Sequence, residues 1–224
     1  MEGKNSDLLP FAIDMVLSSR ILSTNFHANP MNNYSNPFIL GGALRKVPTF
    51  LVNFRFPWGV LVQYFEIPSK YCPFLNCTAG SQLPSMEGLT PAEVALCRFF
   101  LADQKQRNST LKLIPYVSDG PWIARNMVTG TPAIIGKKLP VTYHYEPADE
   151  ASGRAEYLEV DLDIGNSSAT AKRIVSVCRQ YMRALTVDIG FVIEGNTTDE
   201  LPEQMLCSIR VHGPDPLKAS TLRS

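Results

Sequence analysis

The stretch YLEVDLDIGNSSATAKRIVSVCRQYMR, residues 157–183, contains the two clearest secondary-structure signals in the chain. Its first eight residues alternate between aliphatic side chains on one face and acidic side chains on the other, which predicts a half-buried strand. The polar residues 166–168 then supply N-cap side chains for a helix that runs to about Arg183. An apolar stripe along this helix predicts that it packs against a sheet.

Further strands are predicted on both sides of this unit. The run TFLVNFRFPWGVLVQYFEIP, residues 49–68, has two apolar segments separated by Pro57-Trp58-Gly59 and predicts an antiparallel pair. Residues 110–117, 186–195 and 205–211 predict three more strands, and a capping box at Thr90 and Glu93 predicts a helix over 91–105. We therefore expect one α+β domain over residues 1–224. Its curved antiparallel sheet would pack around the long amphipathic helix, helix-grip-like, with an apolar interior.

Composition excludes several classes of protein. The chain has 224 residues, 45% of them hydrophobic, and its 21 basic residues balance 21 acidic ones. The balance argues against the basic surface of a nucleic-acid binder. No apolar stretch reaches the roughly 18 residues of a membrane-spanning helix. An odd number of cysteines, five, and an N-terminus without a leader pattern predict a cytoplasmic protein with reduced thiols.

Residues suited to catalysis or metal binding form no recognisable motif. Glu159, Asp161 and Asp163 share a strand face and could bind a divalent cation, but no second ligand cluster lies at a recognisable spacing, so we interpret this face as solvent-facing. The three histidines lie in separate segments, and none has a nucleophile at a catalytic spacing. We therefore expect no catalytic residue, metal or cofactor, with a hydrolase built on Cys72 or Ser167 as a remote alternative.

Several phrases in the second half of the chain are distinctive. KLIP, GPW, YLEVDLDIG and ELPEQ, in this order, resemble the C-terminal domain of the plant enhanced disease resistance 2 family, and VNFRFPWGVLVQYF resembles its earlier strand pair. The resemblance covers residues 48–215 best, and residues 1–45 match less clearly. In that family the domain usually follows a START module and a pleckstrin homology module, neither of which has a counterpart here. The resemblance implies lipid- and membrane-associated regulation and supplies no catalytic residue.

A sheet curved around a helix can enclose space for an apolar guest. We therefore expect non-enzymatic binding or carriage of an apolar or amphiphilic ligand, such as a lipid, sterol or pigment. In the stretch GPWIAR, residues 120–125, Gly120-Pro121 should end a strand, while Trp122 either forms a wall of the cavity or belongs to a filled core. The candidate wall residues are Phe56, Trp58, Tyr64, Trp122, Tyr181 and Phe191, and the candidate polar contacts are Arg125 and His144.

The alternative is a regulatory interaction module with a filled core, whose exposed patch docks a protein or a membrane surface. The basic pairs Arg45-Lys46 and Lys137-Lys138 could contact anionic headgroups, each charge contributing about 1 kcal/mol. Two or three such charges do not by themselves hold a protein on a membrane, so peripheral contact with an anionic membrane is an open alternative beside the small-molecule ligand. The sequence gives no signal for the oligomeric state.

Overall fold

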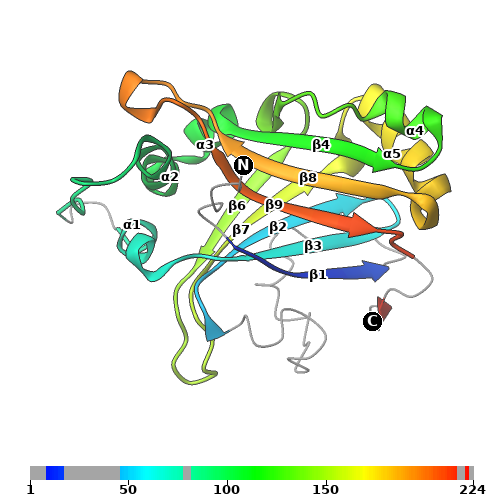
Figure 1. Ribbon diagram of the computed structural model, residues 1–224. Helices are drawn as coiled ribbons and strands as arrows, with labels where there is room; N and C mark the ends of the chain where they lie inside the picture. Colours follow the sequence, from blue (N-terminus) through cyan, green and yellow to red (C-terminus); the bar gives the residue numbers. More distant parts are fainter. Residues whose placement is uncertain (1–8, 18–45, 78–81, 216–219, 222–224) are drawn as a thin grey trace.

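The chain folds into two β-sheets that cross face to face, with short helices at both ends (Figure 1). The computed structural model describes residues 9–17, 46–77, 82–215 and 220–221, and side chains within 46–77 and 82–215. The strands are β1 (Leu9–Leu17), β2 (Thr49–Phe56), β3 (Gly59–Glu66), β4 (Leu111–Asp119), β5 (Ala133–Ile134), β6 (Val141–Glu146), β7 (Tyr157–Asp163), β8 (Thr186–Ile193), β9 (Met205–His212) and β10 (Ser220–Thr221).

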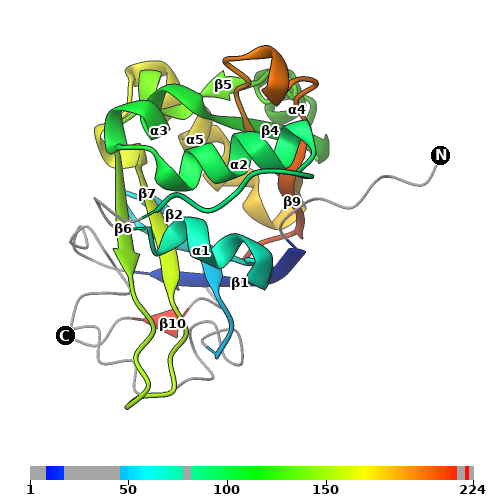
Figure 2. The same cartoon turned by 90° about the vertical axis from the view of Figure 1, so that its left-hand side faces the viewer.

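The helices are short except for two. They are α1 (Cys72–Leu75), α2 (Pro91–Leu101), α3 (Gln104–Thr110), α4 (Trp122–Met127) and α5 (Ala169–Tyr181), with 3-10 turns at Ser69–Tyr71, Ile135–Lys137, Ile164–Asn166, Met182–Ala184 and Thr198–Glu200. Figure 2 shows α1, α2 and α3 together at one end of the molecule, and in Figure 1 α4 and α5 lie toward the opposite end.

The expected α+β class is confirmed, but the arrangement of strands differs from the single antiparallel sheet. A six-stranded sheet has the order β10-β1-β3-β2-β7-β6, and a four-stranded antiparallel sheet has the order β5-β4-β8-β9. The expected antiparallel pair β2–β3 is present, with Phe54 opposite Leu61. β7 pairs with β2 in parallel, so the larger sheet is mixed. Neither sheet closes on itself, and a helix-grip-like arrangement is not confirmed.

Aromatic rings fill the space between the sheets at the end next to α2. Phe50 of β2 contacts Phe65 of β3 and Phe99 of α2, with ring centroids 6.4 Å apart in both pairs. Phe65 meets Phe191 of β8 at 6.1 Å, and all four rings are at most 2% exposed. Burial of such side chains, at about 1.5–3 kcal/mol each, is the main stabilising contribution to this half of the core.

The acidic face of β7 was predicted to face solvent, but Glu159 and Asp161 on this face are buried, so that expectation was wrong. Glu159 is 1% exposed and Asp161 is 2% exposed. The neighbouring strand supplies Asn53, fully buried, whose Nδ2 donates to Asp161 Oδ1 at 2.7 Å and to Glu159 Oε1 at 3.4 Å. Alternation identifies two faces of a strand but not their exposure, and β7 lies inside the sheet between β2 and β6. In the part of the chain that the structure describes, no three His, Cys, Asp or Glu residues gather as metal ligands.

The capping box predicted at the start of α2 is present. Thr90 Oγ1 accepts from the Glu93 backbone N–H, and Glu93 Oε2 accepts from the Thr90 backbone N–H at 2.7 Å. The helix stops at Leu101 rather than near residue 105, because Asp103 starts a new helix by accepting from the Gln106 backbone N–H at 2.8 Å.

Glu93 also connects α2 to the chain just before α1. Burial by itself would raise the pKa of the Glu93 carboxyl, but hydrogen bonds from Lys70, Thr90 and Tyr71 outweigh it and lower the pKa to about 2. A carboxyl whose pKa is lowered on folding stabilises the fold above its usual pKa, and this stability is lost as the pH falls through the folded value.

We expect Glu93→Gln to lower the free energy of unfolding by about 2 kcal/mol at neutral pH, after discounting for the exposed Lys70. The deficit should shrink as the pH falls from near 4.5 to about 2. Urea denaturation across this range measures it, with Glu87→Gln at an exposed position as the control. A deficit of the same size at every pH would contradict the assigned role of the carboxylate.

Candidate functional site

A pocket of about 740 Å³ lies between the two sheets, beyond the aromatic core. Strands β2 and β3 form one wall, β4, β8 and β9 form the second, and α5 forms the third. The segment from the end of α4 to β6 borders the remaining side. The wall residues from the sheets and α5 are largely aliphatic or aromatic, among them Phe54, Phe56, Trp58, Leu61, Leu113, Pro115, Val117, Ile174, Val175, Leu185, Val187 and Ile189.

Three stacked rings form the wall contributed by β2 and the β2–β3 turn. Phe54 and Phe56 lie with ring centroids 6.2 Å apart and an interplanar angle of 13°. Phe56 and Trp58 follow at 4.8 Å and 4°. The Arg179 guanidinium lies over the Trp58 ring, 5.1 Å from its centroid. The rings run from the buried Phe54 to the partly exposed Trp58, so this wall extends from the core to the surface.

One face of α5 forms the third wall. Ala171, Ile174, Val175 and Cys178 line the pocket, and spacings of three and four residues place them on one side of the helix. Ser168 begins the helix as its N-cap, as predicted, with its Oγ accepting from the Ala171 backbone N–H at 3.2 Å. Burial raises the pKa of the Cys178 thiol.

Alternate residues of the smaller sheet form the second wall. Leu113, Pro115 and Val117 of β4 line the pocket, and β8 contributes Val187 and Ile189. In the register of the two strands, Pro115 lies opposite Ile189 and Val117 opposite Val187. Because side chains alternate along a strand, the pairs share one face of the sheet and present a continuous aliphatic surface.

Two of the residues predicted to form a cavity wall line this pocket, namely Phe56 and Trp58. Phe54 lines it as well and was not among the candidates. The apolar face of residues 50–56 marked Phe54 as an inward residue, but the sequence does not tell which inward residues border empty space. That depends on how far the smaller sheet and α5 approach β2.

The prediction that the Trp122 side chain faces inward was wrong, because this side chain lies at the surface. Gly120-Pro121 does end β4 at Asp119, and a Cβ at Gly120 would lie 2.6 Å from Leu185 Cδ2. Trp122 then starts α4 with 68% of its surface exposed, and Arg125 is exposed outside the pocket lining. The other end of α4 reaches the pocket, through Met127 and the adjoining Val128.

The remaining candidates do not line the pocket. Tyr64 is buried on the opposite face of β3 from Leu61. Phe191 is fully buried behind Phe54, with ring centroids 6.4 Å apart. Tyr181 packs on the hydrophobic cluster around Leu185, and His144 of β6 lies 2.9 Å from the Glu146 carboxylate.

The two nucleophiles of the remote hydrolase alternative are poorly placed for attack. Burial, followed by a hydrogen bond and charge repulsion from Glu156, raises the pKa of the Cys72 thiol to about 12. The thiol is therefore protonated at neutral pH and weakly nucleophilic. Ser167 is buried, and its hydroxyl donates to the backbone carbonyl of Ile164 at 2.7 Å. All five cysteines are free thiols, as expected.

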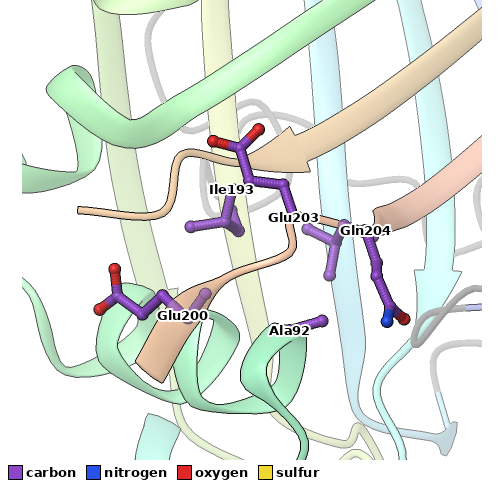
Figure 3. A pocket seen from close by; sticks show the side chains of 7 residues that line it. Ala92, Ile193, Glu200, Glu203 and Gln204 are labelled. Atoms are coloured by element: carbon purple, nitrogen blue, oxygen red, sulfur yellow. The ribbon is translucent and has the colours of Figure 1, made fainter. Parts of the chain in front are cut away.

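A second cleft, between α2 and the ends of β8 and β9, holds only about 10 Å³ (Figure 3). This volume approaches that of one water molecule. The carboxylates of Glu200 and Glu203 point away from each other in Figure 3 and pair with Arg98 and Lys112, respectively. These ion pairs connect neighbouring elements of the fold. Because its volume is only about 10 Å³, the cleft has no room for an organic ligand.

Comparison with known proteins gives the same family as the sequence phrases. The family model described as Protein ENHANCED DISEASE RESISTANCE 2, C-terminal, matches residues 5–215. The chain belongs to this family. The match includes every strand and helix that lines the pocket, so the pocket is part of the ENHANCED DISEASE RESISTANCE 2 C-terminal domain as it occurs here.

A relative from Arabidopsis thaliana, named Protein ENHANCED DISEASE RESISTANCE 2-like, is 39% identical over 114 residues. The aligned part is 51% of this chain and 15% of the relative, so the chain covers only a small part of that protein. No solved structure matches the chain. None of the helices within the described ranges is long and apolar enough to cross a membrane.

Proposed function

We propose that this ENHANCED DISEASE RESISTANCE 2 C-terminal domain binds an apolar or amphiphilic small molecule, such as a lipid, in the pocket between its sheets. The observation that carries the proposal is the pocket itself, about 740 Å³ in volume and lined mainly by aliphatic and aromatic side chains. Small-molecule sites usually have volumes of about 300–1,000 Å³ and linings of this kind.

The chemistry of the lining supports binding without conversion of the ligand. Among the described residues that line the pocket there is no histidine, aspartate or glutamate. These residues supply most general acids and bases in enzymes. The thiol in the lining, that of Cys178, has a raised pKa, and neither it nor the lining hydroxyls have a histidine or carboxylate base among the described lining residues. The driving force for binding would be the removal of apolar area from water, at about 25 cal/mol per Å².

A second function, docking to a membrane surface, is favoured by an exposed patch on α4. Trp122 is 68% exposed, Ile123 is 39% exposed, and the exposed Arg125 follows. An aromatic ring beside an aliphatic and a basic side chain suits the interface of an anionic bilayer. Of the basic pairs considered above, Lys137 and Lys138 are exposed, as is Lys46, whereas Arg45 lies outside the described residues.

Cys178 offers a direct test of the pocket, because it lines the wall while Cys77 does not. Peptide mass spectrometry would measure maleimide labelling of both thiols at alkaline pH, with and without oleyl alcohol, a neutral long-chain probe. At ten times its Kd, oleyl alcohol should slow labelling of Cys178 about tenfold and leave Cys77 unchanged. Organic extraction of protein from a native source should also yield a stoichiometric apolar compound.

Unchanged labelling of Cys178, together with extracts that contain no apolar compound, would refute the proposal. Flotation of the protein with anionic vesicles, combined with an unprotected Cys178, would favour membrane docking as the function instead.

A further inference from the structure

The charged residues that line the pocket all have the same sign. Lys137, Lys138 and Arg179 are in the lining, and no carboxylate is found among the described lining residues. The whole chain has equal numbers of basic and acidic residues, so its composition does not account for this bias. All three side chains are exposed as well as pocket-lining, which places them where the pocket meets solvent.

These three cations have no carboxylate partner within the described ranges. Other basic residues of the chain form ion pairs, such as Arg98 with Asp199 and Glu200, and Arg210 with Asp188. None of the described ion pairs or hydrogen bonds of side chains involves Lys137, Lys138 or Arg179. Their positive charge is therefore available to a ligand.

The position of Arg179 is set by the aromatic wall. The Cζ atom of its guanidinium lies over Trp58, 5.1 Å from the ring centroid, and Trp58 stacks on Phe56 at 4.8 Å. A guanidinium has five N–H donors, so an arginine over an aromatic ring can still donate hydrogen bonds to an anion. Arg179 therefore places a positively charged hydrogen-bond donor at the outer end of the apolar wall.

We infer that the ligand is an anionic amphiphile, with one apolar chain in the pocket and a carboxylate or phosphate headgroup toward Lys137, Lys138 and Arg179. These three residues form the basic rim of the pocket. This inference rests on the proposed binding function and specifies its ligand class. The headgroup stays at the solvent boundary, so the charge attraction is gained without burying an ion. Because the rim is exposed, added salt should weaken the preference for an anion.

Three oleyl probes that differ in the headgroup test the inference through protection of Cys178. Oleate and 1-oleoyl lysophosphatidic acid distinguish a carboxylate from a phosphate, and oleyl alcohol is the neutral reference. At least one anionic probe should bind about tenfold tighter than oleyl alcohol, equivalent to about 1.4 kcal/mol. Preference for one anion identifies the headgroup, and tight binding of both supports the shared anionic chemistry.

Substitutions of the rim residues test whether they cause the preference for anionic probes over oleyl alcohol. Lys137→Gln combined with Lys138→Gln, and separately Arg179→Gln, should each lower the affinity for the anionic probe more than the affinity for oleyl alcohol, so that much of the anion preference is lost. Lys172→Gln with Arg173→Gln is the matched control, because these exposed residues of α5 lie outside the pocket lining. A control variant that loses the preference equally would assign it to the overall charge and overturn the inference.

The two proposals fail in different ways. Equal binding of oleate, lysophosphatidic acid and oleyl alcohol would overturn the anionic ligand class and leave the binding function intact. Failure of all three probes to protect Cys178, in protein whose urea unfolding is cooperative and whose organic extracts contain no apolar compound, would overturn both.

Discussion

Val175→Trp is expected to weaken binding of oleyl alcohol about 100-fold, which corresponds to about 2.8 kcal/mol. Val175 lies midway along α5 and lines the pocket. An indole at this position would project into the space that the ligand occupies, and the ligand would lose both volume and apolar contact. Protection of Cys178 from maleimide, titrated with oleyl alcohol, gives the two dissociation constants.

Ser176→Trp is the matched control for this substitution. Ser176 is the next residue of the same helix, is exposed and is absent from the pocket lining. Its replacement should leave binding of oleyl alcohol unchanged, and circular dichroism should show that both variants keep the native fold. Native affinity in Val175→Trp would mean that the ligand binds elsewhere.

Asn53→Asp is expected to lower the free energy of unfolding by about 3–5 kcal/mol at neutral pH. The Asn53 side chain is fully buried, and its amide donates to Asp161 at 2.7 Å and to Glu159 at 3.4 Å. An aspartate of the same shape removes this donor and places a third carboxyl beside two others. Burial and the neighbouring carboxyls would raise its pKa, so the deficit should shrink as the pH falls toward the usual aspartate pKa of about 3.9.

Urea denaturation at several pH values measures this effect. Asn126→Asp makes the same change at an exposed position of α4 and should change stability by less than about 0.5 kcal/mol. If Asn53→Asp unfolds at the same urea concentration as the native protein, then the amide of Asn53 does not hold the two carboxyls in place.

The candidate site could be predicted only in part. Phe56 and Trp58 were recognisable, because a hairpin with apolar residues on its inner face must cover the core with them. Trp122 was misplaced, since the end of a strand at Gly120 does not fix the direction of the next helix. The basic rim combines Lys137 and Lys138 with Arg179 of α5, residues about 40 positions apart in the sequence that only folding brings to one pocket.

The sequence by itself determined the local elements: the hairpin β2–β3, the capping box of α2, and the N-cap of α5. These follow from alternation, turn residues and caps, which act over a few neighbouring residues. The tertiary structure alone decided that β7 pairs with β2 in parallel, that Glu159 and Asp161 are buried, and that open space remains beyond Phe54. Strand pairing, burial and cavity volume depend on contacts between distant segments, and the periodicity of one segment has no information about them.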